Sequence, residues 1–123
     1  MKSSAQLNVI KIDSKASWEF QLSQASVRNC PIVAHFTAEW CMPSVVMNPV
    51  MEELASAHDN ILFLSVDVDD IKEVAKKYEV KAMPTFLLMK DGVPVDKTIG
   101  ANPEEIKKRV LSLLGPHSDA VTG

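Results

Sequence analysis

The sequence predicts an α/β fold in which a central mixed β-sheet is flanked by helices on both faces. Strands and helices alternate along most of the chain, as they do where helices connect parallel strands. Near the end, two apolar strands are separated only by Asp91-Gly92, a turn signal that indicates an antiparallel hairpin. The 123 residues fit one domain, which we expect to cover 1–115.

The first three elements follow from the spacing of apolar residues. Leu7–Ile12 alternates apolar and polar residues as a half-buried strand does. Ser14 can cap a helix, and the apolar face of that helix consists of Trp18, Leu22 and Ala25. Ile32–Thr37 is almost continuously apolar, which is typical of a strand covered on both faces.

A longer helix is predicted from about Pro43 to His58. Its apolar stripe would consist of residues four apart, namely Val46, Val50 and Leu54. Pro49 lies inside this helix, and we expect a kink there because proline has no backbone donor.

The remaining elements complete the alternation. We expect a buried strand at Ile61–Val66, an amphipathic helix at Ile71–Tyr78, and the hairpin strands Thr85–Lys90 and Val93–Ile99. Pro94 indicates that the last strand lies at an edge of the sheet.

The last helix has clear start and stop signals. Asn102 and Pro103 are a typical cap and first residue, and two acids follow them in the first turn. The buried face would consist of Ile106, Val110, Leu113 and Leu114. Gly115-Pro116 is expected to end the helix, which leaves residues 116–123 as a flexible C-terminal tail.

Composition excludes several classes of protein. The chain is 46% hydrophobic and 24% charged, an ordinary globular mixture. Its net charge of −3 argues against a nucleic-acid partner. No apolar run approaches the ~20 residues of a membrane span, and the first residues do not resemble a secretory signal. With only two cysteines as well, a cytoplasmic protein is expected.

The chemically distinctive segment lies between the strand Ile32–Thr37 and the next helix. Cys41 stands there, where backbone N–H groups and the helix dipole favour a thiolate over a thiol. Ser44, three residues later, is placed to donate a hydrogen bond to that thiolate. Position alone leaves two alternatives open for Cys41, a nucleophile or a small buried hydrophobic residue.

Five segments decide between these alternatives by resemblance. They are Phe36–Pro43 (FTAEWCMP), Val66–Asp69 (VDVD), Val80–Phe86 (VKAMPTF), Lys90–Gly92 and Gly100. In order and spacing the chain resembles thioredoxins, and more closely the plant h-type thioredoxins. The resemblance implies the thioredoxin fold and a reactive Cys41.

Three positions depart together from the thioredoxin pattern. Ser44 replaces the resolving cysteine of WCGPC, so that the motif reads WCMPS. His35 and Ser65 stand where the family has the aspartate and the lysine that help to deprotonate that second thiol. This joint loss resembles the plant CxxS thioredoxin-like proteins, which have a single active-site cysteine.

The resemblance also implies further site residues. The Met83-Pro84 bond would be cis, with the proline against the sulfur and the backbone of Met83 available to a substrate strand. A plain strand-entry proline is the alternative. The substrate-binding surface would consist of Trp40, Met42, Pro43, Met83, Pro84 and Gly100. His35 is either a neutral, hydrogen-bonded core residue or a group that tunes proton transfer beneath Cys41.

Cys30 is not expected to act as the missing second thiol. The strand between it and Cys41 separates the two residues by roughly 20 Å, whereas a disulfide needs Cα atoms within ~7 Å. We expect a structural role for Cys30, with an intermolecular disulfide as the alternative. No metal site is expected, because Cys41 and His35 lack two further ligands at ordinary spacing.

A single thiol predicts monothiol chemistry. A mixed disulfide at Cys41 needs an external thiol for release, either glutathione or another thiol of the disulfide-containing protein substrate. The expected activity is therefore protein disulfide isomerisation with poor net reduction. No cofactor is expected, and glutathione or glutaredoxin would be the reductant. The alternatives are a redox-inert peptide-binding chaperone or adaptor, a glutathione-dependent monothiol transferase, and a glutaredoxin-like iron–sulfur protein.

Overall fold

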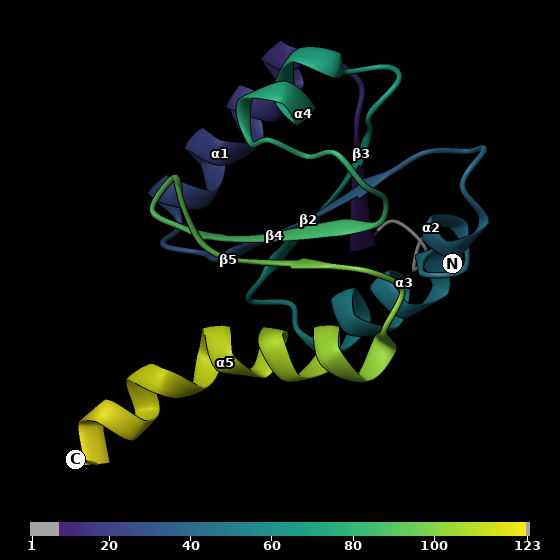
Figure 1. Ribbon diagram of the computed structural model, residues 1–123. Helices are drawn as coiled ribbons and strands as arrows, with labels where there is room; N and C mark the ends of the chain where they lie inside the picture. Colours follow the sequence, from purple (N-terminus) through teal and green to yellow (C-terminus); the bar gives the residue numbers. More distant parts are fainter. Residues whose placement is uncertain (1–7, 123) are drawn as a thin grey trace, which may run out of the picture.

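A five-stranded mixed sheet forms the centre of the molecule in the computed structural model, which describes residues 8–122 (Figure 1). In chain order the strands are β1 (Val9–Ile12), β2 (Ile32–Thr37), β3 (Leu62–Asp67), β4 (Thr85–Lys90) and β5 (Val93–Ile99). In space their order is β1-β3-β2-β4-β5. The predicted mixed sheet is confirmed, and β5 is an edge strand as Pro94 indicated.

The direction of the strands follows from their connections. β1, β3 and β2 run parallel because helices cross between them, whereas β4 is antiparallel to β2 and to β5. Asp91 and Gly92 form the β4–β5 turn with φ of 54° and 79°, the left-handed values that a tight hairpin turn needs. The register between β4 and β5 shifts at Leu88/Met89, where Pro94 lies opposite Met89.

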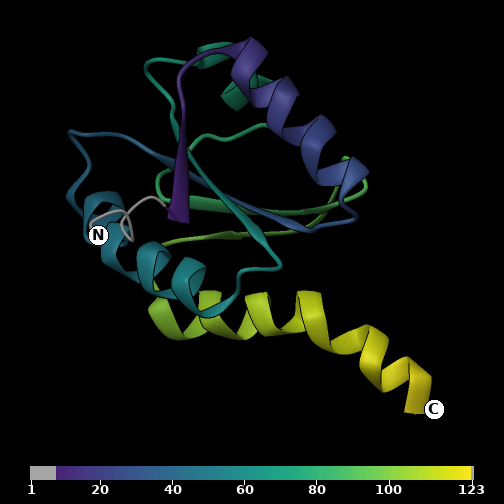
Figure 2. The same ribbon diagram turned by 180° about the vertical axis from the view of Figure 1, so that it is seen from behind.

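Helices cover both faces of this sheet, as Figures 1 and 2 show from opposite sides. The helices are α1 (Lys15–Val27), α2 (Met42–Val45), α3 (Asn48–Ala57), α4 (Lys72–Lys77) and α5 (Pro103–Thr122). α1 and α4 lie on one face, whereas α3 and α5 lie on the other. The caps are those that the sequence predicts, since Ser14 accepts from the Ser17 amide and Asn102 from the Glu105 amide.

Each face has its own apolar core. On one side, Trp18 and Ala25 of α1 and the buried residues of α4 pack against β1, β2 and β3. On the other, Met51 and Leu54 of α3 and Val110 of α5 pack against Val33, Phe63 and Phe86. β2 is therefore buried on both sides, which explains its almost continuous run of apolar residues.

The predicted helix at Pro43–His58 is two helices rather than one kinked helix. α2 ends at Val45 and α3 begins at Asn48, with Pro49 in its first turn, where a missing N–H costs little. The break turns Met47 and Met51 into the core, whereas Val46 is exposed and Val50 is only partly buried. The predicted Val46–Val50–Leu54 stripe is therefore wrong at Val46, whereas Leu54 is buried and Val50 packs partly buried against the core.

The prediction that Gly115-Pro116 ends the last helix is also wrong, because α5 continues to Thr122. A proline inside a helix removes one hydrogen bond and need not stop the chain from continuing in helical form. The buried face of Ile106, Val110 and Leu113 is confirmed, with Leu114 partly buried. Flexibility of residues 116–123 stays a prediction. Leu7, where the first strand was expected to begin, lies outside the described residues.

Candidate active site

Cys41 lies at the junction between β2 and α2. β2 ends at Thr37, a turn closed by the Cys41 amide and the Ala38 carbonyl follows, and Cys41 is the N-cap of α2. Its carbonyl accepts hydrogen bonds from the amides of Ser44 and Val45, both 3.0 Å away. The side chain is partly exposed and makes no capping bond, so a buried core role does not describe it. The thiol stays available to a partner at the surface.

The loop that enters β4 approaches this thiol. The sulfur of Cys41 lies 3.5 Å from the carbonyl oxygen of Met83, and the Met83-Pro84 bond is cis. Gly100 closes the same corner, because its amide donates to the Pro84 carbonyl at 2.9 Å. Its φ of 115° is a value that favours glycine. The structure thus brings Cys41, Met83, Pro84 and Gly100 together, as the sequence predicted.

The hydroxyl of Ser44 contacts Thr37 and His35 rather than the Cys41 sulfur. Its side chain is fully buried, and its hydroxyl donates to the hydroxyl of Thr37 at 2.6 Å. The same oxygen lies 3.4 Å from Nε2 of His35. The predicted hydrogen bond from Ser44 to the Cys41 sulfur is therefore wrong. α2 directs this side chain into the core, toward the polar atoms of Thr37 and His35.

His35 is a buried residue in the middle of the sheet. It pairs with Ser65 across β2 and β3, and its ring stacks on Phe86 with centroids 4.7 Å apart. Burial lowers its pKa from 6.5 to about 4, since desolvation penalises the charged ring. His35 is thus neutral near pH 7, which supports the core alternative over a group that titrates near neutrality.

A cavity of about 350 Å³ extends from His35 toward α3 and the start of β1. Ser65, Asp67 and Glu52 line it together with His35, and desolvation raises the pKa of Glu52. Three carboxyl groups therefore line the cavity, those of Glu39, Glu52 and Asp67.

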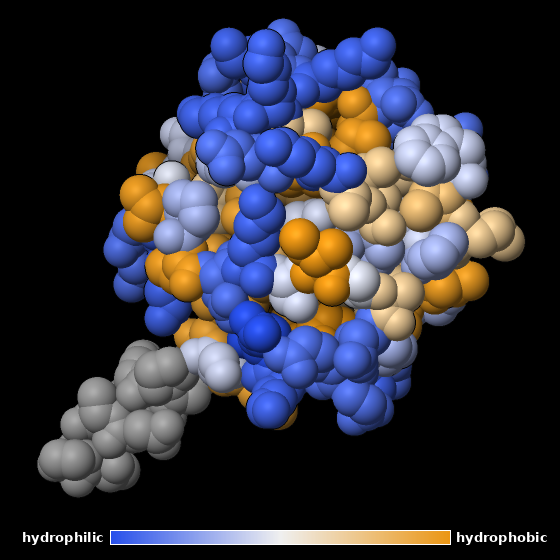
Figure 3. All heavy atoms as spheres, in the orientation of Figure 1, coloured by the Kyte–Doolittle hydropathy of each residue, from blue (hydrophilic) through white to orange (hydrophobic). Residues whose placement is uncertain are grey.

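The surface around Cys41 is apolar. Trp40 and Met42, on either side of it, are 67% and 64% exposed, and Val46 continues the surface along α2. The indole N–H of Trp40 donates to Asp69 at 2.7 Å, which anchors the ring to the loop after β3. Pro43 is exposed in the first turn of α2. Figure 3 shows hydrophobic atoms gathered on this side of the molecule.

Sequence reasoning missed three residues of this site. Thr37 lies in the segment FTAEW and Asp69 in VDVD, so both were inside matching segments without an assigned role. Val46 was assigned to the core instead. The available signal was that Thr37 and Asp69 are polar residues inside matching segments. Only the fold shows that Thr37 contacts Ser44 and that Asp69 contacts Trp40.

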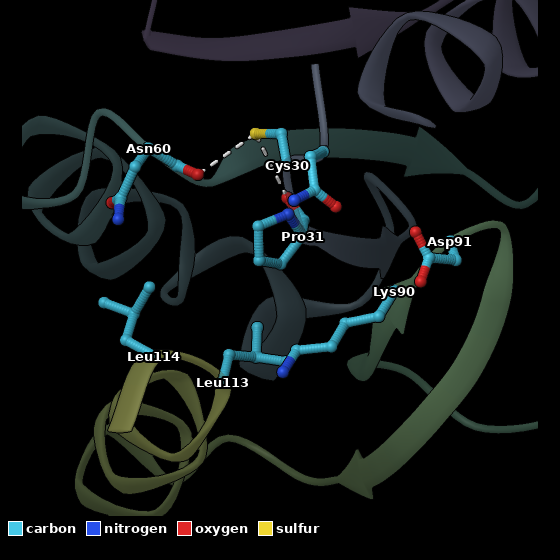
Figure 4. Close-up of a pocket in the computed structure, with 8 residues that line it drawn as sticks. Cys30, Pro31, Asn60, Lys90, Asp91, Leu113 and Leu114 are labelled. Atoms are coloured by element: carbon cyan, nitrogen blue, oxygen red, sulfur yellow. Dashed lines mark hydrogen bonds between the residues drawn. The ribbon is translucent and has the colours of Figure 1, made fainter. Parts of the chain in front are cut away.

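Cys30 lies at the other end of β2, where no site residue joins it. Its thiol donates to the Asn60 carbonyl at 3.1 Å (Figure 4). Lys90, Asp91 and Leu113 border the same hollow, a cavity of about 430 Å³. Both cysteines are free. The length of β2 separates them, so the expectation that Cys30 cannot resolve a disulfide at Cys41 is supported.

Residues 8–122 contain neither a cluster of metal ligands nor a helix that could span a membrane. No three His, Cys, Asp or Glu side chains among those residues gather as metal ligands would. None of the described helices is long and apolar enough to cross a membrane.

Comparison with known proteins agrees with this geometry. The family model described as Thioredoxin matches residues 8–112. The thioredoxin-like protein CXXS1 of Arabidopsis thaliana is 66% identical over 102 residues, which cover 83% of this chain and 86% of that protein. CXXS1 of Oryza sativa subsp. japonica is 53% identical, with 83% and 77% covered. The crystal structure of poplar thioredoxin h, PtTrxh4, has a TM-score of 0.85 at 37% identity, with 88% of this chain and 97% of that chain covered.

Proposed function

The chain belongs to the thioredoxin family of thiol–disulfide oxidoreductases, and we propose that it acts as a monothiol protein disulfide isomerase with Cys41 as its nucleophile. Members of this family act on disulfide-containing proteins and need no cofactor. One observation carries the finer proposal. Ser44 occupies the position where the second thiol would stand, and its hydroxyl is buried and bound to Thr37.

The reaction begins with attack of the Cys41 thiolate on one sulfur of a substrate disulfide. A Cys41–substrate disulfide forms, the substrate S–S bond breaks, and the other substrate sulfur leaves as a thiolate that takes up a proton. Ser44 cannot repeat this attack, because a hydroxyl is not a competent nucleophile toward a disulfide. Release therefore requires a thiol from outside the chain.

Two external thiols fit this requirement. A different cysteine of the same substrate can attack the mixed disulfide, which returns Cys41 to its thiol and leaves the substrate with a rearranged disulfide. No net electrons are transferred in that route. Glutathione can attack the Cys41 sulfur instead, which frees the reduced substrate and leaves a Cys41–glutathione disulfide. A second glutathione then attacks that disulfide, which returns Cys41 to its thiol and forms oxidised glutathione. We place the protein in the cytoplasm, where glutathione or glutaredoxin would act as the reductant.

The surroundings of Cys41 support binding of an extended protein segment. The cis bond at Met83-Pro84 presents backbone of the loop beside the sulfur, where a substrate strand can pair with it. Trp40 and Met42 offer exposed apolar surface on both sides of the sulfur. A protein segment, rather than a small disulfide alone, is the substrate that this surface suits.

Reactivation of a scrambled-disulfide protein in glutathione buffer tests the proposal. We expect wild type to restore activity of the scrambled protein, Cys41→Ser to restore none above buffer, and Cys30→Ser to match wild type. Equal behaviour of wild type and Cys41→Ser would overturn the proposal. Suppressed aggregation by both proteins, without disulfide rearrangement, would instead identify a redox-inert chaperone that uses the exposed surface of Trp40 and Met42. Reduction of small glutathione mixed disulfides without reactivation would identify a monothiol transferase.

A further inference from the structure

A third hollow lies between α4 and the segment that leads to Met83. Its volume is about 550 Å³, larger than that of the cavity beneath His35. Three apolar residues form part of its lining, namely Val68, Ala75 and Val80. Most of the other lining residues are lysines, namely Lys72, Lys76 and Lys81. We call this hollow the lysine groove.

Each wall of the lysine groove is continuous along the chain with a residue of the candidate active site. Val68 donates its amide to the Thr37 carbonyl at 2.9 Å, and the next residue, Asp69, holds the indole of Trp40. On the other wall, Lys81 stands two residues before Met83, whose carbonyl lies 3.5 Å from the Cys41 sulfur. A segment bound at Cys41 can therefore extend into the groove without crossing the core.

The groove is positive in a protein whose net charge is −3. Its three lysines are exposed, and none of them forms an ion pair with a described residue. Glu79 is the one acidic residue in the lining. Lys97 adds a fourth ammonium group close by, because its Nζ donates to the Glu79 carbonyl at 3.2 Å. Figure 3 shows hydrophilic residues over α4 and hydrophobic atoms at the surface just below it.

We propose that the lysine groove binds an acidic segment of the substrate protein that also carries an apolar side chain. The apolar side chain would pack on Val68, Ala75 and Val80, while the carboxylates face the lysines. Carboxylates fit best because the groove offers three unpaired ammonium groups against one carboxylate. This inference names the substrate class for the proposed isomerase and therefore rests on that function.

The charges near Cys41 also fix where the acidic residues of the substrate must lie. Asp69 is placed at Trp40, next to the reactive sulfur, so a carboxylate directly beside the substrate cysteine would be repelled there. Carboxylates several residues away would reach Lys72 and Lys81 instead. The preferred substrate has a neutral cysteine neighbourhood with an acidic segment farther along one side.

The test measures the second-order rate of mixed-disulfide formation at Cys41 with matched peptide disulfides. One peptide carries an apolar residue among three glutamates several residues from its cysteine, on either side in separate versions, and its match carries lysines instead. We expect one acidic version to react about three- to tenfold faster than its match at low salt. The difference should shrink as the salt concentration rises, because surface charges are screened.

Paired variants locate the effect. Lys72→Gln/Lys81→Gln takes one lysine from each wall, whereas Lys15→Gln/Lys108→Gln changes the net charge equally at exposed positions elsewhere. The first pair should lose the preference for the acidic peptide, and the second should keep it. Equal rates for acidic and lysine peptides, or loss of preference in both double variants, would overturn the inference. The uncharged 2-hydroxyethyl disulfide separates the two proposals, because a failure of Cys41 to react with it would count against the function itself.

Discussion

The hydroxyl of Ser44 donates a 2.6 Å hydrogen bond to the hydroxyl of Thr37 at the end of β2. Both groups lie beneath Cys41, and Ser44 is fully buried. The position that a second thiol would occupy is thus filled by a buried hydroxyl that is hydrogen-bonded to Thr37. Ser44 therefore has a packing role of its own at the position of the second thiol.

Ser44→Cys is expected to create a dithiol protein. The introduced thiol would stand three residues from Cys41 in the first turn of a helix, so oxidation should close an intramolecular disulfide. Net reduction of insulin with dithiothreitol should rise by on the order of tenfold, because release no longer needs an external thiol. Mass spectrometry checks the disulfide. A disulfide that forms without any gain in reduction would contradict this explanation.

Ser44→Ala is expected to destabilise the protein by about 1 kcal/mol, because a buried hydrogen bond to Thr37 is lost. Urea denaturation measures the change in the free energy of unfolding. Ser56→Ala, at an exposed position of α3, is the matched control and should stay within about 0.5 kcal/mol of wild type. Equal stability of the two variants would show that the Ser44 hydroxyl contributes nothing.

The lowered pKa of His35 predicts that the free energy of unfolding falls as the pH is lowered. Its pKa is about 4 in the folded protein and 6.5 when unfolded, so between these pH values the unfolded chain binds one more proton. The free energy of unfolding therefore rises with pH across this window, and a lowering of this size corresponds to about 3 kcal/mol lost between pH 6.5 and 4. Urea denaturation at several pH values measures it.

The variant His35→Gln removes this contribution, so its free energy of unfolding should change less between pH 6.5 and 4 than that of wild type. His58→Gln, at the C-cap of α3, is the control and should keep the wild-type dependence. A His35→Gln protein with the same slope as wild type would mean that His35 is not the group that titrates.

The Trp40–Asp69 hydrogen bond is expected to matter for protein substrates more than for small disulfides. Asp69→Ala would release the indole from the loop after β3, so the surface beside Cys41 is no longer held in place. We expect the reactivation rate of a scrambled protein to fall about three- to tenfold, in line with the loss of a charge-assisted hydrogen bond. Exchange with 2-hydroxyethyl disulfide should change by less than about twofold. Equal losses for both substrates would point to a general effect on Cys41.

The fold could be predicted from the sequence because its signals are local and agree with one another. The double-sided burial of β2 follows from Ile32–Thr37, and the hairpin follows from Asp91-Gly92, whose two positive φ values only a few residues adopt easily. The resemblance placed Cys41 beside Met83-Pro84, and the structure confirms both that contact and the cis bond.

The rest depended on geometry that residue patterns do not contain. Pro49 signals a disturbance, but only packing decides whether the helix kinks or breaks, and the break is what buries Met47. Ser44 is three residues from Cys41 in either case, yet the direction of α2 turns its hydroxyl toward Thr37. The lysine groove joins α4 to the segment before Met83, two parts of the chain that no residue pattern links.

Release of a mixed disulfide formed at Cys41 tests the central claim most directly. The Cys30→Ser protein is joined through Cys41 to a peptide with one cysteine or to a matched peptide with two, and free peptide is followed without added thiol. We expect the one-cysteine peptide to stay attached until glutathione is added, whereas the two-cysteine peptide should leave as an intramolecular disulfide. Release of the one-cysteine peptide without any external thiol would contradict monothiol chemistry at Cys41.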